Sequence, residues 1–426
     1  MKQKILFLGT TKGTKQMVEY AKSQGVYTVV TDFVPYEDSE VKQLADEYWM
    51  ISTSELDILE KKCREESIDG LAVGVTEYNL CQQMALTERL GLPCYCTPET
   101  WHYSIDKADF KSVCKTLNVP VPTDYYVSNS PQLDEIEKIQ FPVMVKPVDC
   151  AGNTGVSYCN SKEEFLPAYN LAKKVSSSPK VVIERMLHGK EWWAGYALAD
   201  GEVSLISLCA MYSQPGEPKN CYSLTTNVSN NVVKFVDEIN PLIENVLKKI
   251  GCKEGFAWVQ VMLDEDGCFY VIEMGYRLTG DLVYLLYKDL CGFDTVKWMV
   301  DFALGIEHKK EDLPSPQKSA YKKCSTAYML WTNRSGIISR IEGLDEISNI
   351  SGISIDFQKK VGDTISAYHS IGNILFTADD VNGMCDIIEK VNNIIHVYNE
   401  LDEEVLIKYT DFDYLKKTYY EGLAEK

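Results

Sequence analysis

Apolar and polar residues follow two alternating periods along roughly the first 100 residues. Short apolar runs, as in buried strands, are separated by stretches in which apolar positions recur with helical spacing. The expected elements are strand 4–9, helix 14–24, strand 26–32, helix 55–67, strand 70–75 and helix 78–90. This alternation predicts a doubly wound parallel sheet. The first turn, Gly9-Thr-Thr-Lys-Gly13, lacks Gly-x-Gly-x-x-Gly spacing, so we expect no dinucleotide site there, despite Asp32 at the end of the second strand.

A different pattern, typical of a β-hairpin, occupies residues 258–277. Two runs of β-branched and aromatic residues flank Asp266-Gly267, which favours a two-residue type I′ turn. Counting outward from that turn places Gln260 opposite Glu273, and such paired residues have Cβ atoms about 4.5–5.5 Å apart. Mg²⁺ binds a few protein oxygens together with phosphates and water, so this pair is a candidate metal site, with Arg277 close to any bound phosphate. A hairpin whose polar residues face water explains the stretch equally well.

An apolar strand that ends in a lysine, 141–146, precedes a turn that contains glycine. The turn consists of Ala151, Gly152, Asn153, Thr154 and Gly155. Because glycine adds no side-chain bulk, backbone N–H groups of such a turn can approach a phosphate, and Lys146 would add a point charge. An ordinary hairpin turn is the alternative.

A buried-looking strand, 180–184, leads into an irregular connection that carries Glu184 and Glu191. An extended hinge of this kind can offer backbone groups to an adenine edge, and Glu191 could accept hydrogen bonds from ribose hydroxyls. Solvated glutamates at a strand end are the alternative.

Apolar residues at positions 110, 113, 114 and 117 predict an amphipathic helix. Lys107 lies in its first turn, where the helix dipole does not favour a cation. A phosphate partner or simple solvation would account for that position.

These segments, in this order and spacing, resemble the ATP-grasp superfamily. The resemblance covers roughly residues 1–305 well and the remainder more loosely. The hinge and loop look like those of D-alanine–D-alanine ligases. The first domain and the Glu-Met-x-x-Arg ending at Arg277 look more like biotin carboxylase, carbamoyl-phosphate synthetase and the bacterial L-amino acid ligases.

The resemblance implies the roles of particular residues. The nucleotide would be bound by Lys107, Lys146, Ala151, Gly152, Asn153, Thr154, Gly155, Glu184, Met186, Leu187 and Glu191. Glu273 and Gln260 would hold Mg²⁺ or Mn²⁺, and Arg277 and Lys146 would be the catalytic cations that stabilise the transferred phosphoryl group.

Two residues depart from the pattern of the superfamily. Gln260 stands where a metal-binding carboxylate is usual, and Gly275 stands where an asparagine is frequent. Losing one charge should weaken a second metal ion, for which Asp281 is a candidate replacement ligand. The two outcomes are a site with one tight and one weak metal, or a site with reduced or absent activity.

Composition is that of a cytoplasmic enzyme. The 426 residues contain 14 cysteines without a Cys-x-x-Cys pair, no apolar run of transmembrane length and no signal-peptide pattern, so we expect reduced thiols. The five histidines are too dispersed for a zinc site. A net charge of −19 argues against nucleic acid or an anionic membrane as partner.

The expected architecture combines α/β and α+β parts. Residues 1–105 form a Rossmann-like domain, 106–310 the ATP-grasp domain with a lid near 120–188, and 311–426 a small C-terminal α+β domain. In the last part we expect strands at 327–331 and 353–357, a turn at Gly362-Asp363 and a helix near 378–396.

The expected activity is ATP- and Mg²⁺-dependent ligation of a carboxylate to an amine through an acyl phosphate. The expected substrates are small acids and amines, with amino acids as one option. The alternatives are a purine-pathway or carboxylase-like enzyme acting on glycine or bicarbonate, and a regulatory protein that binds ATP without turnover. The resemblance also implies a possible homodimer.

Overall fold

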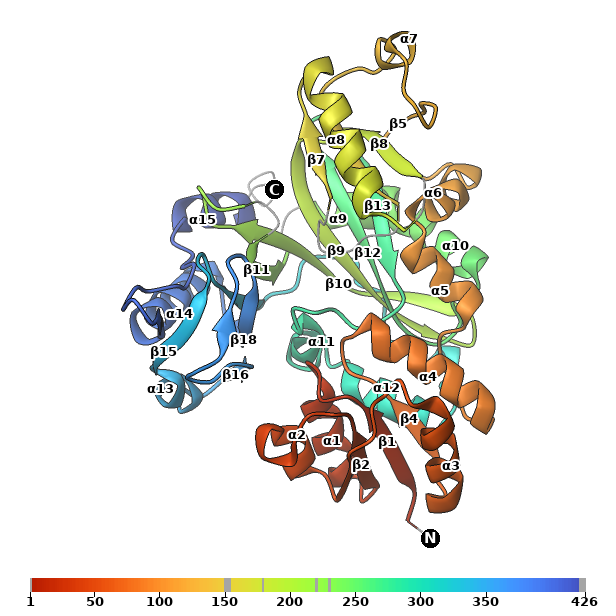
Figure 1. Cartoon of the computed structure of the whole chain (residues 1–426), viewed down its shortest axis with the longest axis vertical. Helices are drawn as coiled ribbons and strands as arrows, with labels where there is room; N and C mark the ends of the chain where they lie inside the picture. Colours follow the sequence, from red (N-terminus) through yellow and green to blue (C-terminus); the bar gives the residue numbers. More distant parts are fainter. Residues whose placement is uncertain (1, 149–154, 178–179, 219–220, 229–230, 421–426) are drawn as a thin grey trace.

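The computed structural model describes residues 2–148, 155–177, 180–218, 221–228 and 231–420. Within them, four sheets form the framework. In Figure 1 the parallel sheet of the N-terminal part lies at the bottom, a small antiparallel sheet lies at the top, and the largest sheet runs between them toward the C-terminal part at the left.

The parallel sheet confirms the expected doubly wound N-terminal fold. Its strand order is β3 (Glu47–Trp49), β2 (Tyr27–Thr31), β1 (Lys4–Leu8) and β4 (Gly70–Ala72). The crossovers are helices α1 (Thr14–Ser23), α2 (Glu40–Leu44) and α3 (Leu56–Glu66), and α4 (Glu77–Leu90) follows β4. Strand β3 and helix α2 were not expected, because both are too short to show a period.

Both carboxylate oxygens of Asp32, at the end of β2, are bound by residues of the N-terminal part. Its Oδ2 accepts hydrogen bonds from the N–H and the hydroxyl of Thr10, at 2.9 and 2.6 Å. Its Oδ1 lies 2.7 Å from the buried ammonium of Lys42. The carboxylate therefore stabilises the first loop.

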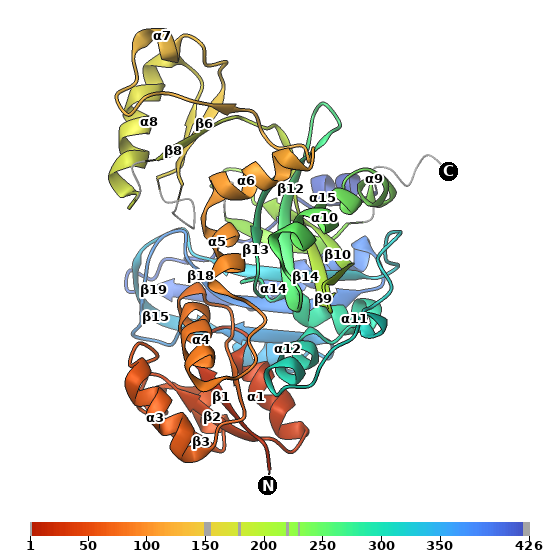
Figure 2. The same cartoon turned by 90° about the vertical axis from the view of Figure 1, so that its right-hand side faces the viewer.

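The small antiparallel sheet has a hydrophobic core of its own. The strand order is β5 (Asp124–Tyr125), β8 (Val181–Arg185), β6 (Val143–Pro147) and β7 (Ser157–Cys159), with helices α7 (Leu133–Ile136) and α8 (Lys162–Val175). Val143, Val145 and Phe165 are fully buried in a cluster that is separate from the main core. This unit stands at one end of the molecule in Figure 2, where the sequence predicted a lid.

The largest sheet has eight strands and joins the middle of the chain to its C-terminal part. The order is β13 (Phe269–Gly275), β12 (Gly255–Asp264), β9 (Gly189–Ala199), β10 (Glu202–Ser213), β11 (Tyr222–Asn227), β14 (Cys324–Trp331), β18 (Ser370–Ala378) and β16 (Ile353–Phe357). Helices α5 (Pro98–Ile105) and α6 (Lys107–Thr116) pack beside β13, and α9 (Val232–Glu238), α10 (Asn240–Ile250), α11 (Tyr287–Cys291) and α12 (Thr295–Ala303) complete the middle part. The sequence did not indicate that one sheet would cross from one part to the other.

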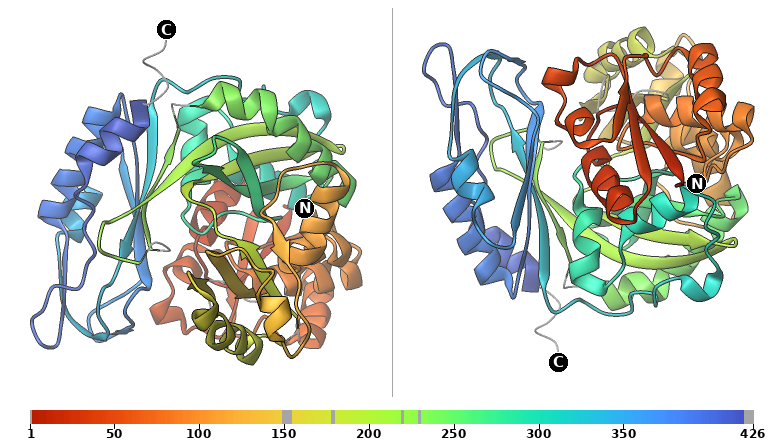
Figure 3. Two further views of the ribbon diagram at one scale, coloured as in Figure 1. Left: turned by 90° about the horizontal axis from the view of Figure 1, so that it is seen from above. Right: turned by 90° about the horizontal axis from the view of Figure 1, so that it is seen from below.

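Besides the last three strands of the largest sheet, the C-terminal part contains a three-stranded sheet and helices. That sheet has the order β17 (Thr364–Ile365), β15 (Gly336–Glu342) and β19 (His396–Asn399), and the helices are α13 (Leu344–Ser348), α14 (Val381–Ile394) and α15 (Phe412–Tyr420). Figure 3 shows the blue helices on the outer side of the blue strands. Strands β14 and β16 and helix α14 agree with the expected elements. None of the described helices has the length and apolar character that a membrane crossing requires.

Candidate active site

The hairpin of β12 and β13 has a different turn from the one the sequence predicted. Leu263 pairs with Phe269, and the Asp264 N–H donates to the Cys268 carbonyl at 3.0 Å, so the loop has three residues. A type I′ turn would require both Asp266 and Gly267 in the left-handed region, but only Gly267, with φ 78°, adopts it. The Asp266 carboxylate instead accepts the Cys268 N–H at 2.8 Å. The two-residue turn was therefore wrong.

The predicted pairing of Gln260 with Glu273 is nevertheless correct. The register shifts between Gln260 and Val261, and Ile272 is the extra residue of a bulge on β13. Without that bulge Glu273 would lie opposite Val259 and face the apolar side, because a one-residue slip exchanges the two faces of a strand. The bulge thus cancels the extra loop residue and puts the carboxylate beside the amide.

One face of three adjacent strands carries the candidate residues. Because paired residues share a face, the register gives the set Glu191, Trp193 and Gly195 on β9, Trp258, Gln260 and Met262 on β12, and Glu273 and Gly275 on β13. Glu191 lies within strand β9, opposite Met262, and not in the irregular connection where we expected it. The Trp193 and Trp258 rings are 4.5 Å apart and provide an aromatic surface next to the polar pair.

Helix α6 brings a lysine to this face. The Asp106 carboxylate caps the helix by accepting the Ala108 and Asp109 N–H groups, each at 2.9 Å. Lys107, the first residue of the helix, places its ammonium 3.1 Å from the Glu273 carboxylate. A cation and an anion thus already meet where the metal and phosphates were expected.

Replacing Asp106 by alanine should lower the free energy of unfolding by about 1 kcal/mol, because the first turn of α6 loses its cap. Urea denaturation measures this change. Ser112→Ala is the matched control, because Ser112 is exposed on the same helix and takes no part in the cap, and its effect should be smaller. Equal losses for both variants would contradict the capping role.

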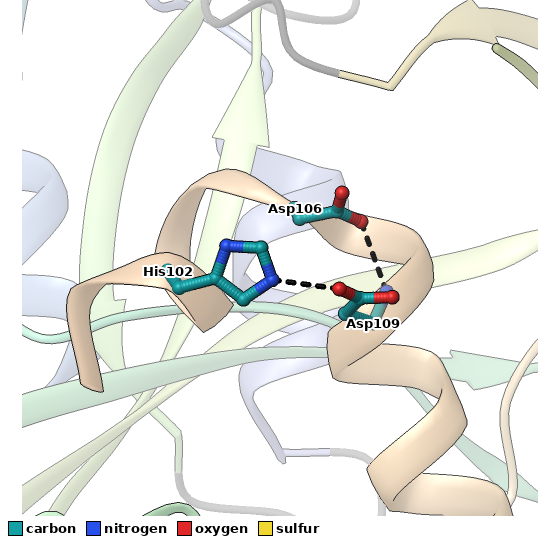
Figure 4. Close-up of side chains that lie close together, drawn as sticks. All are labelled: His102, Asp106 and Asp109. Carbon is teal, nitrogen blue, oxygen red and sulfur yellow. Dashed lines mark hydrogen bonds and ion pairs between the residues drawn. The ribbon is translucent and has the colours of Figure 1, made fainter. Parts of the chain in front are cut away.

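Figure 4 shows that His102 approaches the same turn. His102, Asp106 and Asp109 offer potential ligand atoms within 4.8 Å of one another, and the His102 Nε2 lies 2.6 Å from Asp109. The capping bonds of Asp106 and the His102–Asp109 contact account for these side chains as supports of the α5–α6 corner.

A buried group of charges joins α6 to the small sheet, because Lys111 belongs to α6, Lys146 to β6 and Glu184 to β8. The Lys146 ammonium is 2.8 Å from one oxygen of Glu184, and the Lys111 ammonium is 2.9 Å from the other. Burial alone would lower the pKa of Lys146, but the carboxylates around it, Glu184 first among them, raise it. Burial acts in the opposite direction on Glu184, and the two lysines outweigh it and lower the pKa of that carboxyl. Both groups of the pair are therefore charged near neutral pH.

The hinge after Glu184 leaves one backbone donor available. The Arg185 N–H donates to Thr123 at 2.8 Å, and the Met186 N–H donates to Pro142 at 3.1 Å. Within the described residues the Leu187 N–H makes no hydrogen bond. Leu187 thus retains a group that could bind an adenine edge, whereas the side chain of Glu184 points to lysines.

Arg277 and Gly275 are both explained by Trp258. The Arg277 guanidinium lies 5.5 Å from the centre of the Trp258 ring and 2.9 Å from Glu77 of α4. A Cβ atom on Gly275 would lie 2.2 Å from Cε2 of Trp258. The indole therefore fills the space of a side chain at position 275, and an asparagine there has no room.

Asp281 was the candidate replacement ligand. Its Oδ1 accepts from the Thr279 hydroxyl at 2.6 Å and from the Val283 N–H at 3.1 Å. Its carbonyl accepts from the Asn373 side chain at 2.6 Å, and Asn373 in turn accepts from Lys12 at 2.8 Å. Among the described residues no hydrogen bond joins Asp281 to Gln260 or Glu273. Asp281 instead connects the first loop to the C-terminal sheet, a role that the sequence did not indicate.

The predicted phosphate loop is described in part. Ala151, Gly152, Asn153 and Thr154 lie outside the described residues. Gly155 is described and has φ 75°, and a Cβ atom there would lie 2.4 Å from Val175. The close packing against α8 and the left-handed backbone both require glycine at this position.

A hollow of about 670 Å³ lies away from all these residues. It is lined by the linker around 312–319 and by residues 291–293 next to β10. The candidate site is not part of this hollow. Its lysines and glutamates are in direct contact with one another.

Residues 106–311 match the family model described as the ATP-binding domain of the carbamoyl-phosphate synthase large chain. This match identifies residues 106–311 as an ATP-grasp domain. The match begins at the cap of α6 and extends past Arg277, so it includes the paired residues of the hairpin and the lysines of α6 and β6, but not the first loop, Glu77, His102 or Asn373.

Curated relatives are similar to this chain over part of their length. The formate-dependent phosphoribosylglycinamide formyltransferase of Prochlorococcus marinus is 28% identical over 190 residues, which is 44% of this chain and 48% of the relative. The large-chain N-terminal section of carbamoyl phosphate synthase from Aquifex aeolicus is 25% identical over 311 residues, which is 70% of this chain and 55% of the relative. The chain thus spans about half the length of these two relatives.

Solved ATP-grasp structures share the fold over nearly the whole chain. The biotin carboxylase domain of the Hydrogenobacter thermophilus 2-oxoglutarate carboxylase, in complex with MgADP and bicarbonate, has a TM-score of 0.76 at 18% identity and covers 95% of this chain and 91% of its own. The L-amino acid ligase of Bacillus licheniformis has a TM-score of 0.75 at 18% identity and covers 94% and 99%. The likeness confirms the expected fold class.

Proposed function

We propose that this protein is an ATP- and Mg²⁺-dependent ligase that joins a carboxylate to an amine through an acyl phosphate. The observation that carries the proposal is the convergence of Gln260, Glu273 and Lys107 on one face, next to Arg277. Such a set of one carboxylate, one amide oxygen and two cations suits a metal-bound triphosphate.

The chemistry explains why these residue types are needed. A carboxylate repels the γ-phosphate of ATP, and its carbon is a poor electrophile. In the first step a carboxylate oxygen attacks the γ-phosphorus and ADP leaves; in the second an amine attacks the acyl carbon and phosphate leaves with the electron pair, while the amine gives up a proton. Lys107, Lys146 and Arg277 would offset the charge and hold the oxygens in line, because phosphoryl transfer depends on positioning and electrostatics.

The residues present fit a divalent cation. Gln260 and Glu273 are directly paired across the two strands, so their side-chain oxygens would together hold one ion. When bound, Mg²⁺ or Mn²⁺ would act as a Lewis acid toward the phosphoryl oxygens. Chelation should therefore stop turnover, and added Mg²⁺ should restore it.

The nucleotide would lie between the eight-stranded sheet and the small sheet. Lys146 would contact the phosphates and Glu191 the ribose. The backbone of the hinge at 184–187 would bind the adenine through the Leu187 N–H. Glu191 supports this placement because it shares the face of Gln260 and Glu273 and pairs with Met262, two residues along the strand from Gln260.

The test is to incubate the protein with Mg-ATP and mixtures of amino acids and small carboxylates, and to measure ADP and phosphate. Release should depend on both an acid and an amine. The mixtures include formate, bicarbonate and glycine. A carboxylase-like activity would release ADP and phosphate with bicarbonate in the absence of an amine. A purine-pathway activity would release them with glycine as the single amino acid. Nucleotide binding without release in any mixture would contradict the ligase proposal.

That last outcome corresponds to a second candidate function, a regulatory protein that binds ATP without turnover. Two observations favour it: Gln260 is neutral, and the Trp258 indole occupies the side-chain space at Gly275.

The Gln260→Glu variant discriminates between the two functions. If glutamine is tuned to an active site, the added charge should leave turnover unchanged or lower it. If the site has decayed, Mg²⁺ affinity or ATP hydrolysis should rise. Gln358→Glu, an exposed position far along the chain, adds the same charge as a control.

A further inference from the structure

Helix α6 carries three lysines at intervals of four residues, which places them on one face. Lys107 contacts Glu273, as described above. Lys111 is only 2% exposed and contacts Glu184 and Asp124. Lys115, whose side chain is 44% exposed, lies 2.5 Å from the other oxygen of Asp124.

Two lysines neutralise the buried carboxylate of Glu184. Lys111 holds one of its oxygens at 2.9 Å, and Lys146 holds the other at 2.8 Å. The carboxylate is only 4% exposed, and Asp124 lies directly opposite it on the neighbouring strand. A buried carboxylate with a second anion beside it requires strong compensation, because water cannot stabilise its charge.

We propose that Lys111 is a positioning residue that holds Glu184 in place and so leaves Lys146 able to turn to the nucleotide's phosphates. The inference rests on the proposed function, in which Lys146 binds phosphate. An ammonium has three N–H donors, so Lys146 can keep one bond to Glu184 and use the others for the nucleotide. Lys111 binds the second oxygen of Glu184 and neutralises part of its charge. Without Lys111, Lys146 would be the remaining cation in contact with Glu184 and would be held there more tightly.

The test measures the Kd of ADP and of adenosine by calorimetry in excess Mg²⁺. Lys111→Met should raise the Kd of ADP about tenfold, which corresponds to about 1.4 kcal/mol. The Kd of adenosine should change by less than about twofold, because adenosine has no phosphate for Lys146 to bind and only the small, unspecific effects of a substitution remain. Lys115→Met is the matched control, because it removes a lysine from the same face without touching Glu184, and the Kd of ADP should not change.

A double variant separates positioning from a loss of structure. In Lys111→Met/Glu184→Gln the carboxylate in direct contact with Lys146 is gone, so ADP affinity should return toward that of the unchanged protein. If Lys111→Met does not fold, Lys111→Gln keeps a hydrogen-bond donor for Glu184 and should show the same loss for ADP alone.

Two results would overturn the inference: unchanged ADP affinity in the Lys111 variants, or equal losses for ADP and adenosine that Glu184→Gln does not rescue. Failure of the unchanged protein to bind ADP is a different result, because it would contradict the proposed function itself.

Discussion

Replacing Glu273 by glutamine should lower kcat/KM for ATP-driven turnover by about 10²–10³-fold, the loss seen when one preorganised electrostatic group is removed from a transition state. The reason is the neutrality of its partner. Because Gln260 carries no charge, Glu273 is the anionic member of the pair expected to hold the cation, and it also orders Lys107. Steady-state ADP release over a range of Mg²⁺ concentrations measures the effect.

The unfolding temperature of Glu273→Gln should stay close to that of the unchanged protein, since a partly exposed ion pair contributes only about 0–1 kcal/mol. Glu265→Gln provides the control, because Glu265 is exposed in the loop of the same hairpin and its loss should leave turnover unchanged. Turnover within tenfold of normal in Glu273→Gln, at any Mg²⁺ concentration, would show that this carboxylate does not hold the metal.

Gly275→Ala should lower the free energy of unfolding by about 1–3 kcal/mol, the usual cost of forcing atoms into a packed site. The added Cβ would lie 2.2 Å from Cε2 of Trp258 and 2.3 Å from its Cζ2, so the indole must move. Because Trp258 also lies against Arg277, its displacement should lower turnover as well.

Chemical denaturation of four proteins tests the origin of this cost. The penalty of Gly275→Ala should shrink when Trp258 is already leucine, because the two changes share one contact and are not additive. Gly280→Ala is the control, since a Cβ atom there would meet only Val75, at 3.8 Å. Equal penalties with and without the Trp258 change would rule out the indole as the reason for glycine at position 275.

Much of the framework could be predicted from periodicity. The strands and helices of the first 100 residues show clear apolar periods, and α6 was indicated by Phe110, Val113, Cys114 and Leu117. These signals are local, because each element shows its own period in its own residues.

The pairing of Gln260 with Glu273 was predicted correctly from a wrong turn. The loop has one more residue than expected, and the bulge at Ile272 compensates for it. A bulge on an edge strand depends on what contacts that edge, and here the Val271 N–H donates to Pro120 at 2.8 Å, a contact between distant segments. Such a contact leaves no local pattern.

The supporting residues of the site were harder to predict for the same reason. Lys111 and Glu184 are 73 positions apart, and Lys12 and Asn373 are 361 positions apart. Only the four-residue spacing of Lys107 and Lys111 on one helix hinted that a second lysine would face the site. The meeting of Trp258 and Gly275 depends on side-chain packing across two strands and has no counterpart in spacing.

The most direct test of the proposed chemistry follows an oxygen atom from the substrate carboxylate to the released phosphate. The protein would be incubated with Mg-ATP and a mixture of amino acids whose carboxylates carry ¹⁸O, and the released phosphate analysed by mass spectrometry. An acyl phosphate transfers one carboxylate oxygen to phosphate, so the account predicts phosphate with one ¹⁸O atom, formed in proportion to ADP and lost in Glu273→Gln. ADP formed with unlabelled phosphate, or release of AMP and pyrophosphate, would contradict it.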